Sequence, residues 1–322
     1  MFSQKPISKN LILNILLCII PITYIAGNSV LNLNIFLFLI VFFWSFKLKV
    51  FQLKLNKIDK LIIIFFLYIL INGIINNYFN FNYENEGNVI LYKTIAYMRF
   101  IILYFSLRYL IHNNILSNKL IFFSFGLIAL LVSLDIIYQF FFRVDIFGFE
   151  AQASDRRLAG PFGDEWIAGS FIQRFYIFLI FFFLLFHKLK NKLKFHLVST
   201  LILFLIALGI IMSGNRIPVV MFFLSLFLLI IFEKSLRKNF IIGLIIFFSF
   251  TYVFVKNSEH IKLHYSSFIT KSVEVISYIH GKYSSSGNEK NVFSNSYINE
   301  FESGIYTWKQ NKVFGGGVKS FY

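Results

Sequence analysis

Apolar runs that are long enough to cross a lipid bilayer recur along most of this chain. A helix needs about 20 apolar residues to span the hydrocarbon core. Nine runs approach that length, at residues 11–27, 30–46, 61–77, 90–110, 119–142, 166–186, 196–213, 217–233 and 239–256. The sequence therefore predicts an all-α, polytopic membrane protein with about nine transmembrane helices.

The composition supports this class. Apolar residues make up 57% of the chain and charged residues only 14%, against about 45–50% and about 25% in soluble domains. The chain has a single cysteine, Cys18, which excludes a disulfide or a cysteine-based metal site within one chain. Tyr24 stands where a signal-peptide cleavage site would need a small residue, so we interpret the first run as an uncleaved anchor.

The lysines and arginines between the runs predict the orientation of the chain, because short cytoplasmic loops are enriched in them. With a cytoplasmic N-terminus, the cytoplasmic segments hold Lys5, Lys9, Lys47, Lys49, Lys54, Lys57, Lys60, Arg108, Lys119, Lys188, Lys190, Lys192, Lys194, Lys234, Arg237 and Lys238. The opposite loops hold most of the acidic residues and no lysine until after the ninth run. The net charge of +16 thus follows membrane topology, and we expect no nucleic-acid partner.

The composition changes after the ninth run. Residues 257–322 are rich in Ser, Asn, Lys and Tyr, and the parity of nine spans puts them outside the cytoplasm. Apolar and small residues recur there at helical spacing, which predicts two amphipathic helices. They are Tyr265, Phe268, Ser272, Ile276 and Ile279 in one helix, and Ile298, Phe301, Ile305 and Trp308 in the other. We therefore divide the chain into a transmembrane bundle, 1–256, and the start of a large outer loop, 257–322.

Seven cations before Lys256 do not follow the topology. They are Lys93, Arg99, Arg143, Arg156, Arg157, Arg174 and Arg216. Six of the seven are arginines, whose planar fork binds phosphate or carboxylate through two hydrogen bonds. Arg99 and Arg174 lie inside predicted spans, roughly 10–15 Å deep at about 1.5 Å per residue, where ionisable residues usually face a bundle interior or a cavity.

Arg216 lies in the sequence MSGNRIP, which predicts a tight outer turn. Ser213, Gly214 and Asn215 reverse the chain, and Pro218 suits the first turn of the next helix. We interpret Arg157, Arg174 and Arg216 together as an outward-facing site for the phosphate or diphosphate of a long-chain lipid.

Each arginine alone has a simpler explanation, namely that it snorkels or pairs with a nearby carboxylate. Asp155, Asp164 and Glu165 are near enough in sequence to be such partners. Asp135 lies in the fifth run, and we favour an ion pair with Arg99 or Arg174 over a role as a catalytic base.

The sequence does not favour a metal or a nucleotide. His260 and His264 are four residues apart, but no Glu lies between them and no third ligand is evident. Motifs of the Walker A, G-x-G-x-x-G, H-E-x-x-H and G-x-S-x-G types are missing from the sequence. We therefore expect no metal and no cofactor.

Three stretches occur in the order of known motifs. RRLAGPFGDEWIAGSF resembles the R-x-x-G-x-F outer loop of the superfamily of O-antigen ligases and O-antigen polymerases. MSGNRIPVVMFFLSLFLL is similar to the S-G-S-R turn and following helix of that superfamily. IYTWKQNKVFGGGVKSFY is similar to its W-x-x-A…G-x-G-x-x-x-F region in a large periplasmic loop. The resemblance covers about residues 120–322.

The resemblance implies a metal-independent glycosyltransferase of the bacterial inner membrane, with its active site and residues 257–322 in the periplasm. Such enzymes take a glycan from undecaprenyl diphosphate. A ligase transfers it to lipid A-core, and a polymerase transfers it to another lipid-linked repeat unit, so lipids and glycans are the expected partners. The motif match implies that Arg157 and Arg216 bind the diphosphate. We add Arg174 to this site because of its depth in the predicted span and its side of the membrane.

This sequence departs from the family pattern at two points. The usual Asn of the outer loop falls near Glu165 and Trp166. The family's proposed base, a His beyond the G-x-G-x-x-x-F element, would come after Tyr322. Either the chain is a fragment truncated before that His or it lacks the base, and we assign no catalytic base. Two alternatives stay open: a transporter or flippase of lipid-linked oligosaccharide, and a structural membrane subunit.

Overall fold

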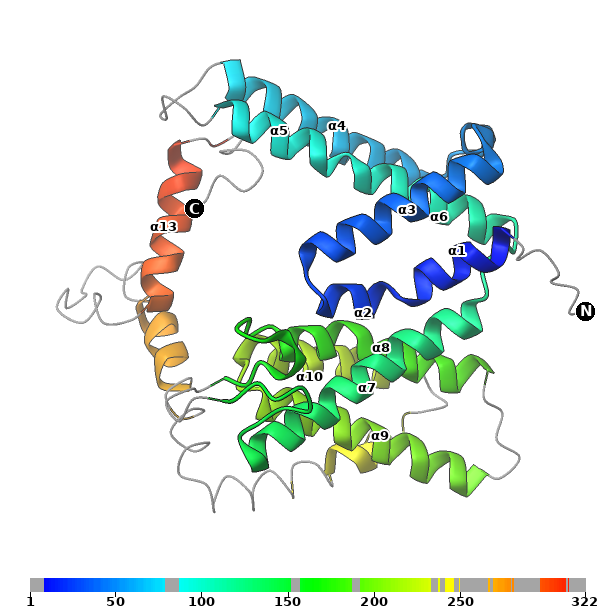
Figure 1. Ribbon diagram of the computed structural model, residues 1–322. Helices are drawn as coiled ribbons and strands as arrows, with labels where there is room; N and C mark the ends of the chain where they lie inside the picture. Colours follow the sequence, from blue (N-terminus) through cyan, green and yellow to red (C-terminus); the bar gives the residue numbers. More distant parts are fainter. Residues whose placement is uncertain are drawn as a thin grey trace, which may run out of the picture. The chain divides into compact units, whose positions relative to one another are not determined.

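The computed structural model describes residues 9–78, 87–151, 157–186, 192–232, 241–245, 269–278 and 296–310, together with residues 237, 249, 266, 280 and 312. Within them, every regular element is a helix (Figure 1), which confirms the predicted all-α class.

Four helices are long and apolar enough to cross a membrane: Asn28–Phe46, Lys57–Tyr78, Ile90–His112 and Asn118–Phe142. Four shorter apolar helices occur at Lys9–Cys18, Ala168–Phe183, Leu197–Met212 and Arg216–Phe232. Helices of this kind indicate a membrane-embedded protein. The number of nine spans remains a prediction, because most of residues 239–256 lies outside the described residues.

The helices closely follow the predicted runs. They are α1 (Lys9–Cys18), α2 (Ile20–Ile25), α3 (Asn28–Phe46), α4 (Lys57–Tyr78), α5 (Gly87–Tyr97), α6 (Arg99–His112), α7 (Asn118–Phe142), α8 (Ala168–Phe186), α9 (Lys192–Met212), α10 (Arg216–Phe232) and α13 (Ser296–Gln310). Two short 3₁₀ helices, η1 (Lys49–Gln52) and η2 (Gly160–Phe162), lie in the connections.

Two predicted spans are each divided into two helices. The first is divided between α1 and α2, where Pro21 lies in the first turn of α2 and has no N–H for the preceding turn. In the fourth, which corresponds to the span Ile90–His112, Met98 is a single turn residue that keeps helical backbone angles, and Arg99 is the first residue of α6.

The chain forms two compact units, which we describe separately. One comprises Met1–Phe38 and Leu116–Phe268, and the other comprises Leu39–Ile115 and Ile269–Tyr322. The predicted division at residues 256 and 257 concerns membrane topology, and it falls outside the described residues.

In the first unit, α7 packs against α8 and α9 through glycines. A Cβ on Gly126 would lie 2.5 Å from the Cα of Leu179 in α8, and a Cβ on Gly209 of α9 would lie 2.8 Å from the Cα of Ser133 in α7. Only glycine permits these approaches, and small residues at helix contacts are typical of membrane bundles.

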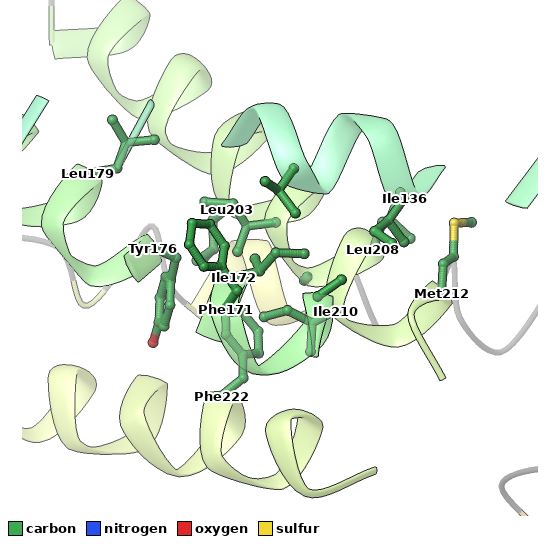
Figure 2. Packing of buried hydrophobic residues seen from close by; sticks show 14 of the residues in the cluster. Ile136, Phe171, Ile172, Tyr176, Leu179, Leu203, Leu208, Ile210, Met212 and Phe222 are labelled. Carbon is green, nitrogen blue, oxygen red and sulfur yellow. The ribbon is translucent and has the colours of Figure 1, made fainter. Parts of the chain in front are cut away.

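Large side chains fill the remainder of this core (Figure 2). Phe171, Ile172 and Tyr176 of α8 are almost completely buried, and so is Phe222 of α10. The Tyr176 hydroxyl forms a 2.5 Å hydrogen bond with the Ser225 hydroxyl, which joins α8 to α10. The core therefore links the four helices α7, α8, α9 and α10.

The second unit contains a polar cluster that the sequence did not predict. The buried carboxylate of Asp59 pairs with the Arg108 guanidinium and accepts a 2.8 Å hydrogen bond from the Tyr104 hydroxyl. Arg108 also donates to the Lys54 carbonyl at 2.7 Å. Arg108 is one of the predicted cytoplasmic cations, and in the structure it joins α6 to the start of α4.

Helices occur in both regions where the sequence predicts amphipathic helices, but Tyr265, Phe268 and Ile279 of the first lie outside the described residues. Residues 269–278 are helical, and α13 covers Ser296–Gln310. Within α13, Ile298 is buried whereas Phe301 and Trp308 are exposed. The Tyr278 hydroxyl donates a hydrogen bond to Glu302, which connects the two segments.

Candidate functional site

The turn between α9 and α10 is as tight as predicted. Ser213, Gly214 and Asn215 lie between the two helices, and Gly214 has a φ of 71°, which a residue with a side chain rarely adopts. The Ser213 hydroxyl donates to the Ile210 carbonyl at 2.6 Å. Arg216 is the first residue of α10. It therefore lies at the positive end of the helix dipole.

The segment before α8 is held by its own buried side chains. Leu158 is 4% exposed, and Phe162 lies with its ring centroid 5.3 Å from that of Phe171 in α8. Gly160 and Gly163 have positive φ values of 54° and 63°, so both glycines of the predicted Gly-Pro-Phe-Gly turn are needed for its shape. Arg157 precedes these anchors and is exposed.

A backbone hydrogen bond joins the two segments. The N–H of Leu158 donates to the carbonyl oxygen of Ser213 at 3.1 Å. Arg157 is next to the donor, and Arg216 follows the acceptor by three residues. The fold thus brings together the segments that carry Arg157 and Arg216, although they belong to different sequence motifs.

Gly169, near the start of α8, lets the same turn lie against the helix. A Cβ at this position would be 2.3 Å from the Ser213 hydroxyl oxygen and 3.0 Å from the Asn215 Cβ. The α9–α10 turn is therefore in contact with both the Leu158 segment and the first turn of α8.

Arg174 differs from the other two predicted site residues. It is exposed on α8, whereas its neighbours Ile172 and Tyr176 are buried. Its side chain therefore lies on the helix face opposite the core of this unit. Its membership in the anion site remains a prediction from its position in the sequence.

The predicted pairing of Asp135 with Arg174 is not found among the described residues. Asp135 is 3% exposed, and its Oδ1 accepts a 2.9 Å hydrogen bond from the N–H of Ile146. This contact ties α7 to the α7–α8 connection instead. Arg99 belongs to the other unit, where its guanidinium lies 4.9 Å from the ring centroid of Phe100.

Two buried polar residues of this region were missed. Gln139 is 2% exposed and Asp145 is 3% exposed. Asp145 Oδ1 accepts hydrogen bonds from the N–H groups of Phe147 and Phe149, at 3.0 and 2.6 Å. The spacing of Asp135 and Gln139, four residues apart in an apolar run, was the available signal, since it places both on one helix face.

Several predicted features fall on undescribed residues. These are Arg156, His260, His264 and the Gly-Gly-Gly element near the end of the sequence.

Comparisons of the chain with protein-family models, with curated proteins and with solved structures found no match. The relation to O-antigen ligases and polymerases therefore remains a prediction from the three sequence motifs.

Proposed function

We propose that this protein transfers a glycan from a polyprenyl diphosphate to an acceptor on the outer side of the membrane. The acceptor would be lipid A-core for a ligase or another lipid-linked repeat unit for a polymerase. The observation that supports this function best is the hydrogen bond from Leu158 to Ser213, because it links the segments of Arg157 and Arg216.

The chemistry suits this pair of arginines. In the transfer, the bond between the anomeric carbon and the diphosphate oxygen breaks, and the bonding electrons leave with the diphosphate. The acceptor hydroxyl forms the new bond to the carbon, and its proton passes to the released diphosphate or to water. Arg157 and Arg216 would stabilise the charge that develops on the diphosphate, and the N-terminus of α10, where Arg216 lies, would add to the effect.

Arg174 would be a third cationic contact from α8. A side chain on the exposed side of an apolar helix can extend its charged end to the membrane interface. A lipid headgroup lies at that depth, so Arg174 would meet a membrane-borne donor before Arg157 and Arg216 bind it.

The test is complementation of a strain that lacks the gene. Arg157→Ala and Arg216→Ala should insert normally but abolish full-length surface glycan. Arg143→Ala is the matched control, because Arg143 is also an exposed arginine of the α7–α8 connection but caps the end of α7. Lysine at position 157 or 216 should restore activity only in part, since it lacks the planar fork.

The product separates the two reactions. Loss of a ligase leaves no glycan on the core, and loss of a polymerase leaves a single repeat unit. Accumulation of the lipid-linked unit on the cytoplasmic side would instead indicate a flippase. The proposed anion site is wrong if both alanine variants insert and still support full-length glycan.

A further inference from the structure

Asp135 and Gln139 lie one turn apart near the end of α7, in a helix that is otherwise largely apolar. Their exposed fractions are 3% and 2%. Burial of such groups is costly unless they form hydrogen bonds, so their partners indicate what the two residues do.

Gln139 binds the outer loop at two points. Its Oε1 accepts a 2.9 Å hydrogen bond from the N–H of Gly160, and its Nε2 donates to the carbonyl oxygen of Phe149 at 3.4 Å. One side chain of α7 therefore fixes backbone groups on both sides of the loop.

Asp135 supports the same arrangement from the preceding turn. Its Oδ1 accepts a hydrogen bond from the N–H of Ile146. If residue 160 had a Cβ, that atom would lie 3.3 Å from the Oδ2 of Asp135. The same Cβ would be 2.9 Å from the Cδ1 of Ile136. Glycine at position 160 is what lets the loop come this close to α7.

The position of Arg157 follows from these contacts. Gly160 is held by Gln139, and Leu158 is held by Ser213; both lie within three residues of Arg157. We propose that Gln139, supported by Asp135, is a positioning residue that sets the place of Arg157 relative to Arg216.

The identity of the ligand that Arg157 binds rests on the proposed function. The anchoring of the loop by Gln139 does not depend on that function. Two arginines bind one diphosphate strongly only if their separation is fixed before the ligand arrives, because ordering a loose loop on binding reduces affinity. A loosened loop should therefore weaken diphosphate binding without altering either arginine.

The experiment compares two variants of the purified full chain in lipid nanodiscs. Gln139→Met removes both hydrogen bonds at similar side-chain volume. Gln139→Glu keeps an oxygen that can accept from the N–H of Gly160. Ser124→Ala is the control: it removes one hydrogen bond of α7, to the Cys18 carbonyl, far from the loop.

Two quantities are measured for each protein. The first is amide hydrogen exchange in the segment Leu158–Gly163. The second is the Kd for farnesyl diphosphate as a short lipid probe, with inorganic diphosphate as a competitor. Competition at equal strength would show that the charged group alone is recognised, and weak competition would show that the lipid contributes.

For Gln139→Met we expect both the exchange rate and the Kd to rise about fivefold or more, the factor carried by one hydrogen bond of about 1 kcal/mol. Gln139→Glu should restore most of both values, and Ser124→Ala should resemble the wild type. Exchange at the wild-type rate in Gln139→Met would overturn the anchoring. Faster exchange with an unchanged Kd would overturn the effect on Arg157.

The experiment also distinguishes two further outcomes, namely that the wild type does not bind the probe and that Gln139→Met does not fold. If the wild type does not bind farnesyl diphosphate, the proposed function fails, and the exchange data alone decide whether Gln139 holds the loop. If Gln139→Met does not fold, Gly160→Ala tests the same anchor from the loop side, through the contact of its Cβ with Ile136. It should give the same rise in exchange and in Kd; wild-type values would count against the proposal.

Discussion

The N–H of Leu158 and the carbonyl oxygen of Ser213 form a 3.1 Å hydrogen bond between residues that are buried and far apart in the sequence. A buried hydrogen bond is shielded from competition by water. It therefore holds the loop that carries Arg157 against the turn that leads to Arg216.

Gly169→Ala should disturb this contact from the α8 side. The new Cβ would lie 2.3 Å from the Ser213 hydroxyl oxygen, so the turn must move or the hydroxyl must rotate. We expect a loss of about 1–3 kcal/mol in the free energy of unfolding, as for other overpacked sites. Thermal unfolding of the purified protein in detergent measures it.

Gly304→Ala is the matched control for this substitution. Gly304 lies in α13, and a Cβ there would meet nothing within 4 Å. Alanine should leave stability unchanged or raise it slightly, because it favours the helix. Equal melting temperatures for the Gly169 and Gly304 variants would contradict the close packing at Gly169.

Asp59→Asn should destabilise the second unit by about 3 kcal/mol, because it leaves the guanidinium of Arg108 without its charged partner. Asp59 is fully buried and the Arg108 side chain is 19% exposed. Tyr104→Phe removes only one hydrogen bond to the same carboxylate and should cost about 1 kcal/mol. Unfolding in a denaturing detergent measures both changes.

A double-mutant cycle provides the decisive comparison for this ion pair. Asp59→Asn combined with Arg108→Gln should cost less than the sum of the two single changes, by about 1 kcal/mol or more. Strictly additive costs would show that Asp59 and Arg108 do not interact in the folded protein.

Asp145→Ala should loosen the turn after α7. The carboxylate accepts the N–H groups of Phe147 and Phe149 through Oδ1, and alanine offers no acceptor. Asp145→Asn keeps an oxygen at that position. Hydrogen exchange of residues 146–150 should therefore rise about fivefold or more in the alanine variant and stay near the wild-type rate in the asparagine variant. Identical exchange in both variants would rule out this role.

The topology can be tested because the chain has a single native cysteine, Cys18. In a Cys18→Ala background, we expect a membrane-impermeant maleimide to label Asp164→Cys in intact cells but to label Asn113→Cys only after lysis. Both positions are exposed, so the difference would report the side of the membrane. Labelling of both in intact cells would refute the predicted orientation.

Much of the local structure could be predicted from the sequence. Long apolar runs predicted helices at nearly their observed bounds, because the thickness of a bilayer fixes the length of a span. The three residues Ser213, Gly214 and Asn215 predicted the tight turn before α10, since a glycine with positive φ reverses the chain within a few residues. The break at Pro21 also followed from local chemistry.

The sequence by itself thus determined the helical class, most helix ends and the presence of unusual arginines. Only the tertiary structure decided that Leu158 meets Ser213, that Gln139 holds Gly160, and that Asp59 pairs with Arg108. The tertiary structure also placed Arg174 on the exposed face of α8. The position of Arg174 within its predicted span did not indicate this face. Local elements depend on neighbouring residues, whereas these contacts depend on how helices distant in sequence pack, and that packing is set by close approaches such as Gly126 against Leu179.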